Sequence, residues 1–75
     1  MDEDYRNWLI EKIIQYLPNG YVRTGMEINC RCPICGDSKK NTLKRRGYLN
    51  LENGSYFCHN CGASFKSGLK FLESI

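Results

Sequence analysis

The chain has 75 residues, a net charge of +3 and five cysteines. A chain this short rarely builds a core that is stable by itself, so we expect an added source of stability such as a metal ion. The odd cysteine count and the lack of a signal sequence argue against a secreted disulfide scaffold and favour a reducing, cytosolic setting. No apolar run approaches the ~20 residues needed to span a membrane.

The charge is divided unevenly along the chain. Residues 1–20 carry a net charge of −2, whereas residues 21–75 carry +5. The positive part is also the part that contains the cysteines, which indicates an anionic partner such as nucleic acid. Four metal-bound thiolates would balance some of this excess, so the charge alone is a modest signal.

Residues 4–17 are predicted to form an amphipathic helix. Asp2 and Asp4 suit its N-terminus, and the Pro-Asn-Gly sequence at residues 18–20 ends it. We expect its apolar stripe to pack on the rest of the domain, and the alternative is that the helix docks on another protein or domain. The stripe consists of Tyr5, Trp8, Leu9, Ile10, Ile13, Ile14 and Leu17.

Residues 21–25 look like a connector, and residues 26–31 look like a short strand. Cys30 and Cys32 alternate along this strand and should therefore point to the same side. We expect Cys30 to be a small buried hydrophobic residue, with a spare metal ligand as the alternative.

Two Cys-x-x-Cys-Gly stretches, at residues 32–36 and 58–62, dominate the sequence. Two thiolates at this spacing can enclose one metal ion, and the glycine lets the backbone bend sharply after the second thiolate. The 22 residues between the two pairs fit a hairpin plus a loop. The sequence therefore predicts one tetrahedral zinc ion per chain, bound by Cys32, Cys35, Cys58 and Cys61.

Residues 37–47 follow the first cysteine pair and read as an exposed, basic loop. We interpret the loop as a flexible arm that grips phosphate groups, and the alternative is a solvated loop that balances the charge of the metal site. Its basic residues are Lys39, Lys40, Lys44, Arg45 and Arg46.

Residues 48–51 and 56–58 are predicted to pair as a hairpin, because Asn53-Gly54 is a strong signal for a two-residue turn. Such a turn would pair Leu49 with Cys58. One face would then meet the metal and the core, and it would contain Leu49, Leu51, Tyr56 and Cys58. The other face would contain Arg46, Tyr48, Asn50, Phe57 and His59. That second set has the composition of a base-stacking platform, unless the N-terminal helix covers it.

Residues 63–66 read as a further short strand, and Ser67 is expected to cap a final helix over residues 67–75. Together these elements predict a small α+β, metal-stabilised domain that comprises residues 1–75. Its centre would be a zinc ribbon over residues 26–66, a short antiparallel sheet with two cysteine turns, with a helix on each side.

The string from Arg31 to Ser38, Arg-Cys-Pro-Ile-Cys-Gly-Asp-Ser, resembles the zinc-binding domain of tailed-phage DNA primases, and so does the Arg-Gly-Tyr sequence at residues 46–48. Residues 56–64, Tyr-Phe-Cys-His-Asn-Cys-Gly-Ala-Ser, resemble the matching segment of bacterial primases. The resemblance covers about residues 21–72. Bacterial members have histidine as the second ligand, so Cys35 follows the phage pattern, and His59 matches no ligand position.

This resemblance implies a zinc ribbon that recognises the start trinucleotide on single-stranded template and steadies the first nucleotides of the primer. It implies a location in the cytoplasm of a bacterium or a phage-infected cell, with a primase catalytic domain or a replicative helicase as further partners. In primases a separate domain carries the carboxylates that hold the catalytic metal ions. We therefore expect no polymerisation by this chain alone, whether it is the N-terminal part of a primase or a free-standing relative.

Two other classes of function compete with this interpretation. A free-standing phage zinc ribbon could bind a polymerase or another protein through the helix near Trp8. An iron electron carrier similar to rubredoxin would share the Cys-Pro-x-Cys-Gly turn, but the basic loop argues against it and visible colour would reveal it.

Overall fold

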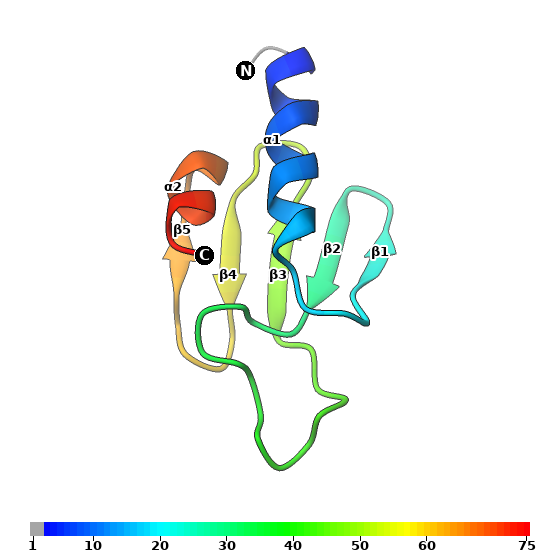
Figure 1. Ribbon diagram of the computed structural model, residues 1–75, viewed down its shortest axis with the longest axis vertical. Helices are drawn as coiled ribbons and strands as arrows, with labels where there is room; N and C mark the ends of the chain where they lie inside the picture. Colours follow the sequence, from blue (N-terminus) through cyan, green and yellow to red (C-terminus); the bar gives the residue numbers. More distant parts are fainter. Residues whose placement is uncertain (1–2) are drawn as a thin grey trace.

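The computed structural model describes residues 3–75, so the expected capping role of Asp2 lies outside the described residues. Five strands form one antiparallel sheet in the order β1-β2-β3-β4-β5, with a helix at each end of the chain (Figure 1). The elements are α1 (Glu3–Gln15), β1 (Val22–Thr24), β2 (Glu27–Cys30), β3 (Gly47–Asn50), β4 (Tyr56–Cys58), β5 (Ser64–Phe65) and α2 (Gly68–Glu73). The small α+β class that the sequence predicts is the class observed.

Helix α1 covers one face of the sheet and contacts α2 (Figure 1). Leu9 and Ile13 are its fully buried residues, as the helical spacing predicts. Tyr5 and Trp8, which were expected in the same stripe, are instead about half exposed and stack on each other. The reason is that the N-terminal turns of α1 project past the end of the sheet and have no strand beneath them (Figure 1).

The core lies between the sheet and the two helices. Ile28 and Leu49 meet the helices from neighbouring strands, and both are fully buried. The Tyr56 ring stacks on the Phe71 ring with a centroid separation of 3.9 Å and an interplanar angle of 9°. Burial of each such side chain contributes about 1.5–3 kcal/mol, so this stack is a main attachment of α2 to the sheet.

Strand β1 corrects the expectation that residues 21–25 form a connector. Val22–Thr24 pairs with β2 across a two-residue turn at Gly25 and Met26. All three strand residues are exposed, so the segment shows none of the apolar alternation that marks a half-buried strand.

The β3–β4 hairpin has a different register from the one predicted. Leu49 pairs with Tyr56 and Gly47 with Cys58, because the loop has four residues, 51–54, instead of two. Leu51 leaves the hairpin ladder, donates its N–H to the carbonyl of Met26 and is buried. The shift amounts to two residues, and side chains alternate with a period of two, so the predicted faces are nevertheless correct.

The C-terminal elements lie close to their expected positions. Ser67 occupies the N-cap position of α2, but its side chain makes no capping hydrogen bond, which differs from the expectation. None of the helices within residues 3–75 is long and apolar enough to cross a membrane.

Candidate metal centre and nucleic-acid interface

The four cysteines of the two Cys-x-x-Cys turns come together at one end of the sheet. Their sulfur atoms all lie within 4.8 Å of one another. The Sγ atoms of Cys32 and Cys61 are 3.9 Å apart, and those of Cys35 and Cys58 are 3.8 Å apart. A tetrahedral ion with metal–sulfur bonds of about 2.3 Å needs sulfur separations of about 3.8 Å. The cluster can therefore hold a metal ion with little rearrangement.

Each turn has the same local geometry. The N–H of Gly36 donates to the carbonyl of Cys32, and the N–H of Gly62 donates to the carbonyl of Cys58, both at 2.9 Å. Both glycines have positive φ, 74° and 77°, a conformation in which a side chain would be strained. The N–H groups of the two glycines therefore close the turns, and the hydrogen bonds to the sulfur atoms come from other N–H groups.

N–H groups surround two of the sulfurs. Asp37 N–H and the side-chain amide of Asn60 each donate to Cys35 Sγ at 3.4 Å. Asn60 N–H donates to Cys58 Sγ at 3.3 Å. Burial raises the pKa of Cys35, but the donors from Asn60 and Asp37 outweigh it and lower that pKa to about 7. Donors of this kind stabilise a thiolate, which is the form that binds a metal.

The hydroxyl of Tyr56 is a buried polar atom that has no hydrogen-bond partner within residues 3–75. It lies beside Cys32, a thiol whose pKa is raised by burial. A metal-bound thiolate at Cys32 would supply the acceptor that the hydroxyl lacks. This unpaired donor therefore fits a negatively charged sulfur cluster.

Cys30 lies outside the cluster of four. Its side chain is fully buried, and burial next to Cys32 and Cys58 raises its pKa to about 12. A thiol with such a pKa stays protonated and behaves as a small hydrophobic group.

Asp37 links the first cysteine turn to the far end of the basic loop. Its buried carboxylate accepts hydrogen bonds from Ser38 N–H at 2.8 Å, Arg46 N–H at 2.7 Å and Arg46 Nε at 2.8 Å. Burial raises the pKa of Asp37, but the contacts with Arg46 outweigh it and hold that pKa below its usual value. Sequence reasoning missed this role. The sequence feature that could have indicated this role is that Asp37 is the one acidic residue within the basic segment 37–47.

The Arg31 side chain stabilises the same loop through hydrogen bonds to its backbone. Its guanidinium donates to the carbonyls of Gly36, Ser38, Asn41 and Lys44 at 2.8–3.1 Å. The loop projects beyond the end of the sheet that carries the cysteines (Figure 1). The expected flexible arm is therefore a loop with a defined shape.

The five predicted phosphate contacts divide into two groups. Arg46 is paired with Asp37, and Arg45 Nε donates to the side chain of Asn29 at 3.2 Å. Lys39, Lys40 and Lys44 are exposed, and within residues 3–75 their ammonium groups have no partner. Among these five cations, the lysines are the ones whose charged groups have no side-chain partner within residues 3–75.

Tyr48, Phe57 and His59 meet on the sheet face opposite α1. The His59 ring forms T-shaped contacts with the Tyr48 and Phe57 rings at centroid separations of 5.2 Å and 4.7 Å. The Phe57 side chain remains 41% exposed, so the N-terminal helix does not cover this face. A hollow of about 290 Å³ lies beside Tyr48 and Phe57 and is also lined by Asn50 and Lys66. Lys66 was not singled out from the sequence.

No protein-family model matches the chain. It is 37% identical over 49 residues to the DNA primase of Enterobacteria phage T4. The matched part is 63% of this chain, and it corresponds to 14% of the primase. The chain thus has local similarity to a phage DNA primase and contains four cysteines that could hold a metal ion.

Proposed function

We propose that Cys32, Cys35, Cys58 and Cys61 bind one zinc ion and that the zinc-bound domain recognises single-stranded DNA in primase-related replication. Four thiolates in a tetrahedral arrangement are typical ligands of structural zinc, which leaves no open position for catalysis. The zinc would fix the two turns, and any nucleotidyl transfer would belong to another domain.

The observation that carries the DNA-binding proposal is an open aromatic face beside a basic loop. Single-strand-binding proteins combine aromatic rings that stack on bases with cations that follow the phosphate backbone. Tyr48, Phe57 and His59 offer the rings, and Lys39, Lys40 and Lys44 offer free ammonium groups. Arg45 and Arg46 contribute positive charge while they hold the loop.

The similarity to a phage DNA primase supports the same proposal. In this proposal, the chain acts as a template-recognition module that helps to start the RNA primer. A primase catalytic domain or a replicative helicase would be the protein partner.

The test measures the affinity of the zinc-loaded protein for fluorescent single-stranded oligonucleotides by anisotropy. Each stacked base contributes about 1–3 kcal/mol, so Tyr48→Ala and Phe57→Ala should each weaken binding by about 5- to 150-fold. Tyr16→Ala is the matched control, because Tyr16 is 60% exposed and lies just after α1, away from this face. If both variants keep zinc and bind as well as the control does, the aromatic face does not contact bases.

A salt titration tests the loop separately. Three phosphate contacts predict that log affinity falls with log salt at a slope of about −2, from about −0.7 per contact. Replacing Lys39, Lys40 and Lys44 with alanine should flatten this slope, whereas Lys12→Ala and Lys70→Ala on the helices should not. An unchanged slope in the triple variant would show that the loop does not contact phosphates.

A further inference from the structure

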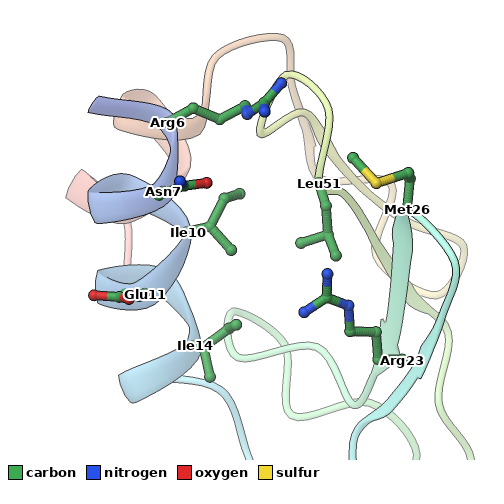
Figure 2. A pocket seen from close by; sticks show the side chains of 8 residues that line it. All are labelled: Arg6, Asn7, Ile10, Glu11, Ile14, Arg23, Met26 and Leu51. Atoms are coloured by element: carbon green, nitrogen blue, oxygen red, sulfur yellow. The ribbon is translucent and has the colours of Figure 1, made fainter. Parts of the chain in front are cut away.

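A groove separates α1 from the β1–β2 hairpin on the side of the sheet away from the aromatic face (Figure 2). Its volume is about 390 Å³. Ile10 and Ile14 point into it from the helix, and Leu51 and Met26 face them from the other wall (Figure 2). Met26 is 51% exposed, so the groove presents aliphatic surface to solvent instead of closing over it.

Two guanidinium groups border this aliphatic surface. Arg6 reaches over one end of the groove from α1, and Arg23 lies at the other end, on either side of Leu51 (Figure 2). The Arg23 side chain lies on the α1 side of the sheet because Arg23 pairs with the buried Ile28. Within residues 3–75, neither arginine has an ion-pair partner. Glu11, the acidic residue of the lining, points away from the groove (Figure 2).

We propose that this groove binds a short acidic segment of another protein, with an aliphatic side chain between Ile10, Ile14 and Leu51 and carboxylates on Arg6 and Arg23. The charges at the two ends are complementary to such a segment, and guanidinium groups bind carboxylates with directed hydrogen bonds. The aliphatic centre would bury the side chain between those two contacts. Strand β1 forms the edge of the sheet beside the groove, so its backbone is also open to a neighbouring chain.

Single-stranded DNA suits this groove less well than an acidic peptide does. The lining contains no aromatic ring on which a base could stack. The rings of Tyr48 and Phe57 lie on the opposite face of the sheet, so both ligands could bind at once. The docking proposal thus extends beyond DNA recognition and does not depend on it.

The test selects binders to the zinc-loaded protein from a display library of short random peptides. We expect the enriched peptides to carry an aliphatic residue flanked by Asp or Glu, and to shift the NMR signals of the Ile10, Ile14 and Met26 methyl groups. The variant with both Arg6→Glu and Arg23→Glu should bind these peptides roughly tenfold more weakly.

The control variant carries Lys12→Glu and Lys70→Glu, which make the same charge change on the two helices at residues that do not line the groove. It should bind the peptides as well as the unmodified protein does. The proposal is overturned if the selection yields no binder, if the enriched peptides lack acidic residues, or if both variants bind equally. Displacement of the peptides by an oligonucleotide would also overturn the proposal, because it would show that DNA binds in the groove.

Discussion

The buried carboxylate of Asp37 determines how the first cysteine turn and the basic loop are joined. In Asp37→Asn one carboxylate oxygen becomes an NH₂ group, so at least one of the three donors that now point at it loses its acceptor. The least costly orientation places the NH₂ group at the Oδ2 position, which leaves the backbone N–H of Arg46 unpaired.

The size of the effect follows from these contacts. An unpaired buried donor costs about 1–3 kcal/mol. The lost attraction to the Arg46 side chain adds about 1 kcal/mol, a small value because 32% of that side chain is exposed and water screens the pair. If folding is coupled to metal binding, the total of about 2–4 kcal/mol weakens zinc binding by about 30- to 700-fold.

Competition with a zinc chelator at neutral pH measures this loss. The pKa of Asp37 is depressed in the folded chain, so its contribution is complete above the unfolded pKa of about 3.9 and is lost as the pH falls through the lower folded value. Neutral pH therefore samples the full effect. Glu52→Gln is the isosteric control, since Glu52 is an exposed residue of the β3–β4 loop. Equal zinc affinity in the two variants would refute the reasoning.

Two further predictions concern the surroundings of the sulfur cluster. Tyr56→Phe should stay folded but bind zinc about tenfold more weakly in chelator competition, because the partner of a metal ligand is lost. An unchanged affinity would show that the hydroxyl does not donate to Cys32. Cys30→Ala should retain one zinc per chain by elemental analysis, because the buried thiol lies outside the cluster. Loss of the metal in that variant would make Cys30 a ligand.

Features that depend on the spacing of cysteines and on the alternation of side chains along a strand could be predicted from the sequence. A loop and a hairpin between two Cys-x-x-Cys pairs can bring the pairs together, and the four sulfurs lie within 4.8 Å of one another. Alternation along residues 46–59 separates the buried Tyr56 and Cys58 from the exposed Phe57 and His59. A register error of two residues leaves this separation intact, so the faces were predictable although the pairing was not.

Features that depend on backbone pairing or on single polar contacts were not predictable. Strand β1 buries none of its residues, so it is held by backbone pairing with β2, which leaves no apolar pattern in the sequence. The four-residue loop at 51–54 is favoured by burial of Leu51 and by the side chain of Asn50, which accepts the N–H of Glu52. A strong Asn-Gly turn signal was overridden by these contacts.

The basic loop lies between Cys35 and Cys58, and both of its ends are tied to the cysteine turns. Asp37 anchors one end beside Cys35, and the carbonyl of Arg46 accepts the N–H of His59 in the second turn at 2.9 Å. Removal of zinc would release both anchors. It would also replace a cluster with a charge of −2 by thiols that are mostly neutral, with Cys35 partly ionised at neutral pH.

These two effects of zinc removal have opposite consequences for DNA binding. Electrostatics alone predicts tighter binding, because the metal-free chain is more positive. Loss of the defined loop and of the β3–β4 platform predicts weaker binding, because the cations and rings must then be ordered at an entropic cost. We expect the second effect to dominate, so that oligonucleotide affinity measured at low salt falls after chelation. An affinity that rises instead would mean that the loop acts through its charge and not through its shape.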